Sequence, residues 1–143
     1  MKRDFVISQE LSMKQQSLPS GGWVLLPQGA LDSNTSEEFR NRVQQFLDEK
    51  EPPRSLLLDL SGVKYLSSVG LGALIQLLKK SELTRSLFAL YDPQLAVRRV
   101  LEISKLDFLL VDPLEIGELG PFSEYVTRKE TERAAARAAA PKR

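Results

Sequence analysis

The sequence predicts an α/β fold: a mixed β-sheet, made of an N-terminal hairpin and then parallel strands, with helices packed against it and a C-terminal tail. Short apolar runs alternate with segments of helical spacing after Gly29, an order typical of parallel strands joined by helices. The length of 143 residues and the hydrophobic content of 42% suit a single hydrophobic core. We therefore expect one domain.

The N-terminal hairpin is predicted from two segments rich in β-forming residues, Phe5–Leu11 and Trp23–Leu26. Turn-forming residues fill Ser17–Gly22 between them, so the two segments are expected to pair in antiparallel fashion. Pro27 lacks a backbone N–H and is expected to limit how far the second strand pairs.

The first helix is predicted after Gly29, where Phe39, Val43, Phe46 and Leu47 recur at helical spacing. Thr35 and Glu38 have the spacing of a capping box, which marks the start of this helix. The Pro52–Pro53 pair prevents its continuation.

Strands and helices then alternate. The apolar run Ser55–Leu60 predicts a strand at the sheet centre, and Ser86–Tyr91 predicts another strand. Between them, Val69–Ser81 returns to helical spacing. The expected buried stripe of that helix is Leu71, Leu74, Ile75 and Leu78.

The third helix is predicted to start at Asp92–Pro93, with Asp92 as its cap and Pro93 as its first residue. Its inner face is expected to carry Val97, Val100 and Leu101, and its outer face Arg98 and Arg99. A last short strand is expected at Phe108–Val111.

The domain is expected to cover residues 1–118, followed by an Ala/Arg-rich tail over residues 119–143. Alanine triplets favour helix in this tail, but they offer almost no apolar stripe for docking. We therefore expect the tail to be partly helical or disordered.

Composition excludes several classes of function. The chain has no cysteine and no histidine, so it has no thiolate nucleophile, no serine–histidine triad and no metal site built on either residue. We expect no enzymatic activity, no cofactor and no bound metal. The net charge of +1 and the lack of a long apolar run favour a cytoplasmic protein that binds neither nucleic acid nor membrane.

The segment Leu56–Leu78 carries most of the functional information, because a buried strand leads there into Ser67, Ser68, two glycines and a helix. Three interpretations are open. A serine caps the helix, the exposed N–H groups bind a phosphate ligand, or a serine itself receives a phosphate. The second lacks the lysine of a P-loop and the third glycine of GxGxxG.

Three blocks of the chain resemble a known family: GALDSNTSEEFRNRV, PRSLLLDLSGVKYLSSVGLGALIQLLKKS and LFALYDPQLAVRRVLEISKLDFLL. Together they look like the STAS domain of bacterial anti-sigma-factor antagonists, over roughly Phe5–Pro113. The resemblance implies partner switching. The unphosphorylated antagonist binds an anti-sigma factor that is a serine kinase, phosphorylation by that kinase breaks the complex, and a metal-dependent serine phosphatase restores it.

The family's phosphorylated serine lies at the start of the second helix, in a pattern like Asp-Ser-Ser-Gly-Leu. Aligning Gly70 and Leu71 with its Gly-Leu places Ser68 at the acceptor and Ser67 where the family often has Asp. Ser67 is the alternative acceptor. The resemblance also implies a partner-binding surface, which we expect to consist of Asp32, Ser33, Ser67, Ser68, Gly70 and Leu71.

Further expectations concern single residues, the oligomeric state and an alternative function. Asp32 and Ser33 are equally explained as helix-capping residues, and Asp59 is expected to bind the N–H groups of the neighbouring loop. The chain is expected to be a monomer or a weak homodimer. An alternative function is that of a STAS scaffold or signalling subunit that docks a sensor, transport or second-messenger component without phosphorylation.

Overall fold

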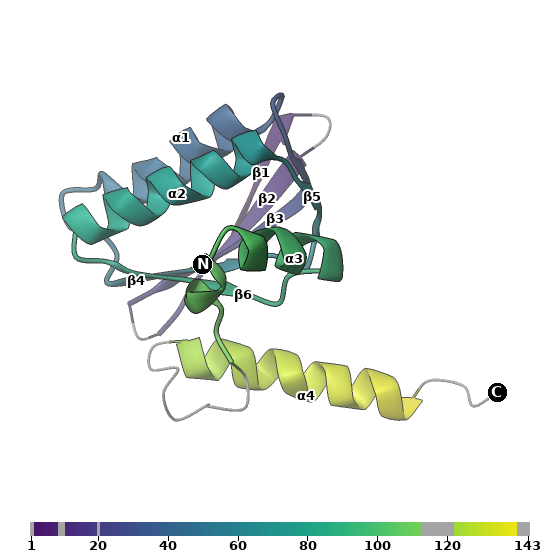
Figure 1. The fold of residues 1–143 in the computed structure, drawn as a ribbon. Coiled ribbons are helices and arrows are strands. Elements are labelled where there is room, and N and C mark those ends of the chain that lie inside the picture. The colour runs from purple at the N-terminus through teal and green to yellow at the C-terminus, as the bar shows by residue number, and fades with distance from the viewer. Residues whose placement is uncertain (1, 9–10, 20, 113–121, 140–143) are drawn as a thin grey trace.

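Six strands form one mixed sheet, with helices on both of its faces (Figure 1). The computed structural model describes residues 2–8, 11–19, 21–112 and 122–139. The strands are β1 (Lys2–Ser8), β2 (Leu11–Ser17), β3 (Trp23–Leu31), β4 (Ser55–Asp59), β5 (Val63–Leu66) and β6 (Leu87–Tyr91). The helices are α1 (Ser36–Leu47), α2 (Ser68–Leu83), α3 (Leu95–Ile103) and α4 (Ser123–Ala139), with a 3₁₀ turn η1 (Asp107–Leu109).

The sheet order is β1-β2-β3-β4-β6, and β5 pairs with the far end of β3. The pairs β1–β2 and β2–β3 are antiparallel, whereas β3–β4, β3–β5 and β4–β6 are parallel. The predicted class, an antiparallel N-terminal part followed by parallel strands, is therefore confirmed. β4 lies between two strands and is buried along its whole length, as its continuous apolar run predicts.

The N-terminal strands differ from the prediction. Instead of one strand over Phe5–Leu11, the chain forms β1 and β2, which pair with each other, and it is β2 that pairs with β3 across residues 18–22. The sequence does not predict β2, because polar residues such as Lys14, Gln15 and Gln16 interrupt the alternation of apolar and polar residues that marks a strand. β3 also continues through Pro27 to Leu31, because Pro27 lies between the stretches that pair with β4 and β5.

Alternate side chains of the central strands point to two separate apolar clusters. On β4, Leu56 and Leu58 join the cluster beneath α1, α2 and α3, whereas Leu57 joins the cluster beneath α4. This period of two follows from strand geometry. Figure 1 shows α1 and α2 side by side on one face and α4 on the other.

The first two helices follow the predicted positions with differences in detail. The capping box of α1 is wrong: Thr35 is the N-cap residue, but its side chain makes no cap hydrogen bond. Its hydroxyl instead donates to the Ala30 carbonyl at 2.7 Å. The buried residues of α2 are Gly70, Ala73, Leu74, Leu77 and Ser81, so Leu71, Ile75 and Leu78 lie at the margin of the core.

The predicted start of the third helix is wrong. Helix α3 begins at Leu95, with Gln94 as its N-cap residue. Asp92 has φ +56°, a left-handed conformation in which it cannot cap the helix as proposed. The Gln94 side chain donates instead to the Ser61 carbonyl at 2.9 Å, which links this loop to the loop after β4. Arg98 and Arg99 are exposed, as predicted.

The predicted last strand at Phe108–Val111 is also wrong. The segment forms η1, followed by one isolated parallel bridge between Leu90 and Leu110. Phe108 is 70% exposed, whereas Leu109 is buried. The apolar run was therefore misread as a strand, because short runs of this kind do not distinguish strand from turn.

The C-terminal segment docks more firmly than the sequence suggests. The predicted boundary after residue 118 falls within residues 113–121, outside the described residues, and stays a prediction. Residues 123–139 form α4, and Phe122, Tyr125 and Val126 at its start are 1%, 1% and 0% exposed. These three residues pack into the apolar cluster on the second face of the sheet. The rest of α4 is largely exposed.

Candidate functional site

The two adjacent serines at the start of α2 have different roles in the structure. Ser67 is the N-cap residue, and its hydroxyl accepts a hydrogen bond from the Gly70 backbone N–H at 3.1 Å. Ser68 is the first helical residue and is exposed. The cap role therefore belongs to Ser67, and the Ser68 hydroxyl lies at the surface at the positive end of the helix dipole.

The start of α2 is fixed against the end of β3 through backbone contacts. The Ser67 N–H donates to the Leu31 carbonyl at 2.9 Å. A Cβ added at Gly70 would lie 2.5 Å from the same Leu31 oxygen and 2.8 Å from Leu66 Cδ1. Only glycine permits this approach. Gly70 is thus required to bring the helix start and the β3 end together.

The loop after β3 is folded by its own side chains. Asp32 Oδ1 accepts from the Asn34 N–H at 2.9 Å, and the Asp32 N–H donates to Thr35 Oγ1 at 3.0 Å. The Asp32 carbonyl accepts from the N–H groups of Thr35 and Ser36. Asp32 therefore shapes the turn before α1, but its carboxylate caps no N–H group of the helix, because Thr35 is the N-cap residue; Ser33 is exposed.

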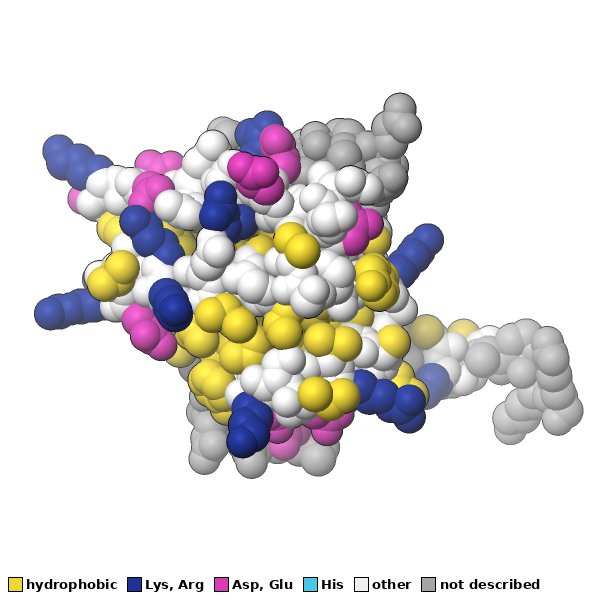
Figure 2. All heavy atoms as spheres, turned by 45° about the horizontal axis from the view of Figure 1, so that its top comes forward, with side chains coloured by type: hydrophobic (Ala, Val, Ile, Leu, Met, Phe, Trp, Pro, Cys, Tyr) yellow, Lys and Arg dark blue, Asp and Glu magenta, His cyan; other side chains and the backbone are white. Residues whose placement is uncertain are grey.

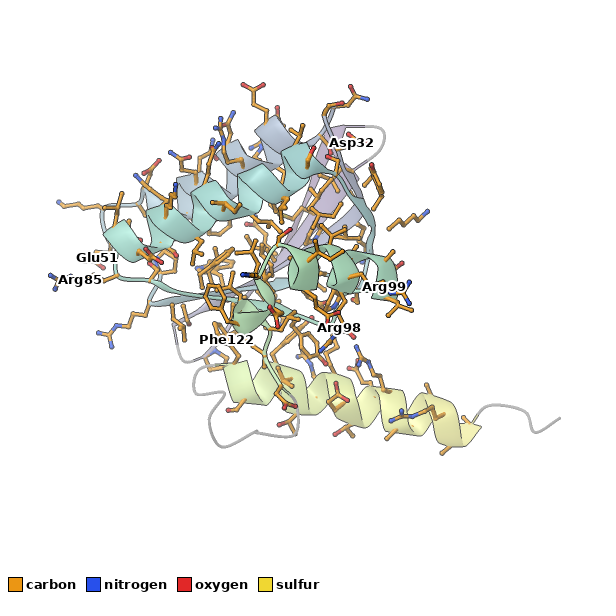
Figure 3. All side chains as sticks on the ribbon, viewed as in Figure 1. Asp32, Glu51, Arg85, Arg98, Arg99 and Phe122 are labelled. Atoms are coloured by element: carbon orange, nitrogen blue, oxygen red, sulfur yellow. The ribbon has the colours of Figure 1, made fainter. Side chains whose placement is uncertain are left out.

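The structure brings the predicted partner-binding residues to one end of the molecule, but they are not equally accessible. Asp32 lies at the end of the sheet where α1 and α2 begin, and Glu51 and Arg85 lie at the opposite end (Figure 3). Ser33 and Ser68 are exposed, whereas Gly70 is buried. Those of intermediate exposure are Asp32, Ser67 and Leu71.

Exposed hydrophobic side chains extend this surface beyond the predicted residues. Tyr65 in β5 and Val69 in α2 flank Ser67 and Ser68 and are 57% and 51% exposed, and Leu95 at the start of α3 is 64% exposed. Figure 2 shows hydrophobic side chains gathered in the middle of the face that carries α2 and α3, with Lys and Arg around them. Such a patch is typical of a protein-binding surface.

A buried polar network joins α4 to the sheet and was missed by sequence reasoning. Asp59 Oδ1 accepts from the Ser61 N–H at 3.0 Å, as predicted, but Oδ2 accepts from the Tyr125 hydroxyl at 2.5 Å. The Tyr91 hydroxyl donates to Glu130 Oε1 at 2.7 Å. Arg133 forms ion pairs with Asp92 and Glu130.

Both tyrosines of this network are held in the neutral form. Burial is the largest cause that raises the pKa of Tyr91, followed by its hydrogen bond to Glu130. Burial and then the negative charge of Asp59 raise the pKa of Tyr125. Each phenol keeps the proton that it donates to its carboxylate, so the network is structural. Among the described residues, no group of three acidic side chains is placed to hold a metal.

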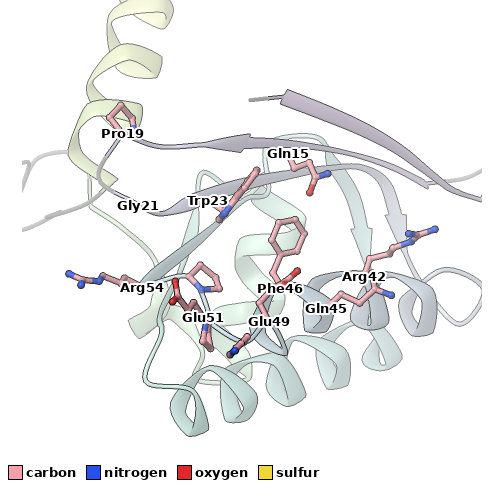
Figure 4. Close-up of a pocket in the computed structure, with 13 residues that line it drawn as sticks. Gln15, Pro19, Gly21, Trp23, Arg42, Gln45, Phe46, Glu49, Glu51 and Arg54 are labelled. Atoms are coloured by element: carbon pink, nitrogen blue, oxygen red, sulfur yellow. The ribbon is translucent and has the colours of Figure 1, made fainter.

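A large groove lies away from Ser68, at the end of the molecule where α1 stops (Figure 4). It has a volume of about 1240 Å³ and is lined by residues of β2, β3, α1 and the loop that follows α1. Trp23 and Phe46 pack edge to face in it, with ring centroids 5.3 Å apart. None of the residues predicted for the site lines this groove.

Within the described residues, no helix is both long and apolar enough to span a membrane.

Comparison with known proteins shows which family and which solved structures this chain resembles. The sequence model of the STAS domain matches residues 14–118. A putative anti-sigma factor antagonist from Thermotoga maritima is similar in structure, with a TM-score of 0.61, 26% identity and coverage of 68% of this chain and 84% of that one.

Two further structures share the fold. The Bacillus cell fate determinant SpoIIAA in its phosphorylated form has a TM-score of 0.58 and 17% identity, covering 70% of this chain and 89% of that one. A sulfate transporter family protein from Wolinella succinogenes has a TM-score of 0.59 and 15% identity, covering 79% and 93%. At these identities the likeness concerns the fold alone.

Proposed function

This chain belongs to the STAS-domain family, and from that premise we propose that it is an anti-sigma-factor antagonist that acts by partner switching. Without phosphate it binds an anti-sigma factor that is also a serine kinase. Phosphorylation of Ser68 releases that partner, and a metal-dependent serine phosphatase restores binding. The protein acts in the cytoplasm as a regulator and not as an enzyme.

The position of Ser68 carries the proposal. Ser68 is exposed as the first residue of α2, whereas the hydroxyl of the neighbouring Ser67 is engaged in the helix cap. This difference favours Ser68 over Ser67 as the acceptor. An aspartate at position 67, which the family often has, would accept the same hydrogen bond from Gly70, so serine there preserves the local geometry.

The physical basis of the switch is the charge that phosphorylation adds to an apolar surface. A phosphate brings about −1.5 to −2 charges at neutral pH, and the N-terminus of α2 stabilises them. The fold therefore tolerates the modification. A partner that packs on Val69 and Tyr65 must strip water from this phosphate, and the desolvation weakens the complex.

The test is to isolate a serine kinase bound to the protein from native lysate and to incubate the pair with ATP. We expect mass spectrometry to find phosphate on Ser68 and Ser68→Ala to prevent labelling. Ser67→Asp is the matched control, because it keeps an acceptor for the Gly70 N–H, and it should be labelled like the wild type. Full labelling of Ser68→Ala would contradict the assignment.

A second measurement tests release. Ser68→Asp should weaken binding to the same kinase at least tenfold, which corresponds to about 1.4 kcal/mol. The alternative function predicts a different result: the lysate would yield a sensor, transport or second-messenger component, and Ser68 would stay unmodified.

A further inference from the structure

A cleft lies between the N-terminal halves of α1 and α2, next to the phosphorylation site proposed above. Its volume is about 400 Å³, and its walls are formed by residues that include Ser36 and Arg40 on α1 and Val69, Gly72 and Gln76 on α2. A Cβ built on Gly72 meets no atom within 4 Å, so this side of the cleft is open. Val69 directly follows Ser68 in the sequence.

Two polar groups of this cleft have no hydrogen-bond partner. Ser36 is only 1% exposed, and its Oγ is unpaired. The Nε of Arg40 is also buried and unpaired, although Nη1 donates to Gln76 Oε1 at 2.6 Å and Nη2 to Asn41 Oδ1 at 3.1 Å. Leaving a buried donor unsatisfied is unfavourable by about 1–3 kcal/mol, so these groups point to a missing acceptor.

The two unpaired groups are placed to act together. Ser36 and Arg40 are four residues apart on α1, so their side chains lie on the same face of the helix. The bonds to Gln76 and Asn41 hold the guanidinium group in position, while its Nε has no partner. An acceptor with two oxygen atoms can therefore bind the Ser36 hydroxyl and the Arg40 Nε–H at once.

The N-terminus of α1 adds to the attraction for an anion. Its N-cap residue, Thr35, makes no side-chain cap hydrogen bond, because the hydroxyl donates to the Ala30 carbonyl. The first-turn N–H groups of Glu37 and Glu38 are thus left without a capping side chain. Unpaired N–H groups and the helix dipole both favour negative charge at this end.

The charge balance selects among anions. Arg40 contributes one positive charge to the cleft, and the exposed carboxylate of Glu37 contributes one negative charge at its edge. Because these opposite charges offset each other, a phosphate dianion gains no more net attraction than a group with a single negative charge, and it is more costly to desolvate. The two oxygens of a singly charged carboxylate also match the two unpaired donors.

We propose that the cleft between α1 and α2 binds a carboxylate, which an acidic side chain of the partner supplies when it docks beside Ser68. This inference rests on the proposed function for the identity of the partner. The carboxylate bound in the cleft would also repel a phosphate on Ser68, because the two groups would lie close together. Phosphorylation and the acidic side chain then exclude each other from the same part of the surface.

The cleft is tested first without any partner, by titrating the full chain with acetate and following the ¹H–¹⁵N NMR signals. We expect saturable shifts in the millimolar range for the amides of Ser36, Glu37 and Glu38 and for the Nε–H of Arg40. Sodium chloride at equal ionic strength should not reproduce them. Inorganic phosphate should bind more weakly than acetate, and tighter binding of phosphate would overturn the charge argument.

Two variants and one control complete the test. Arg40→Gln should weaken acetate binding at least tenfold, and Ser36→Ala, which removes only a hydroxyl, should weaken it several-fold. Arg54→Gln is the control, because Arg54 is exposed at the opposite end of the molecule (Figure 4). Saturation of Arg40→Gln at the wild-type acetate concentration would overturn the proposal.

A separate experiment tests whether the partner supplies the carboxylate. Arg40→Gln should weaken binding of the kinase at least tenfold and Arg54→Gln should not, and equal affinities for wild type and Arg40→Gln would refute this source. The acetate experiment involves neither kinase nor phosphate. A failed acetate titration therefore contradicts the proposal for the cleft but not the phosphorylation of Ser68. An unmodified Ser68 contradicts the proposed function but not the binding of a carboxylate in the cleft.

Discussion

Gly70 and Gly72 lie two positions apart in the first turns of α2, yet their surroundings are opposite. Gly70 is buried against the Leu31 carbonyl, whereas the space beside Gly72 is empty. The sequence shows two glycines and does not distinguish them. At the residue scale, the site therefore depends on one glycine that allows a close backbone approach and one that leaves a cleft open.

This difference predicts opposite effects of the same substitution. Gly70→Ala places a methyl group 2.5 Å from a backbone oxygen and should lower the free energy of unfolding by about 1–3 kcal/mol. Gly72→Ala meets no obstacle and should raise it by up to about 1 kcal/mol, because alanine favours helix. Urea denaturation measures both. Equal effects would show that α2 does not approach β3 as described.

The serine pair is the part of the site that the sequence predicts best. The pattern of a strand, two serines and a helix already indicates a helix cap, and the family resemblance points to Ser68. The sequence leaves open which serine is the cap, because both precede helical residues. The hydrogen bond from Gly70 to Ser67 decides this, since only Ser67 has the extended backbone of an N-cap residue.

At the scale of elements, α4 differs most from the sequence-based expectation. Its composition suggests a solvated tail, but Tyr125 and Val126 complete the second apolar cluster with Leu57 and Ala89. Burial is confined to the start of the helix. A count of apolar residues over the whole segment therefore underestimates the docking, because the apolar contacts lie in the first turn and Glu130 and Arg133 add polar contacts further along the helix.

The contact between α4 and β4 gives a prediction for the element. Tyr125→Phe removes the hydrogen bond to Asp59 Oδ2 and leaves a buried carboxylate oxygen unpaired. We expect the free energy of unfolding to fall by about 1–3 kcal/mol in urea denaturation. Tyr65→Phe is the control, since Tyr65 is 57% exposed, and it should change stability little. A Tyr125→Phe protein as stable as the wild type would refute the role of this bond.

At the scale of the whole molecule, the sheet is covered on both faces, and the buried phenols of Tyr91 and Tyr125 join the second face to α4. The two ends of the molecule carry different surface features. The start of α1 and α2 carries Ser68 and the cleft, while the opposite end carries the large groove beside Trp23 and Phe46. The surface available to a partner is thus separate from the face that α4 covers.

The buried tyrosines predict how stability depends on pH. Burial raises the pKa of Tyr91 and Tyr125 in the folded protein above the ordinary value of 10.0, so the neutral form stabilises the fold. This stabilisation is complete below about pH 10 and is lost as the pH rises above it, because the unfolded chain then releases protons that the folded chain retains.

Denaturation midpoints measured between pH 8 and 11 check this dependence. The wild type should lose stability above pH 10, and the double substitution Tyr91→Phe with Tyr125→Phe should lose less over the same range. Parallel pH profiles for the two proteins would contradict the assignment of the effect to these phenols.

The sequence by itself determined the alternation of strands and helices, the buried central strand and the serine pair at the start of α2. These features depend on neighbouring residues and on periodicity, which local chain geometry fixes. Only the tertiary structure decided that Asp92 turns into a left-handed conformation, that Tyr125 binds Asp59, and that Ser36 and Arg40 face α2 across a cleft. Each of these depends on segments far apart in the chain, whose contact no local pattern records.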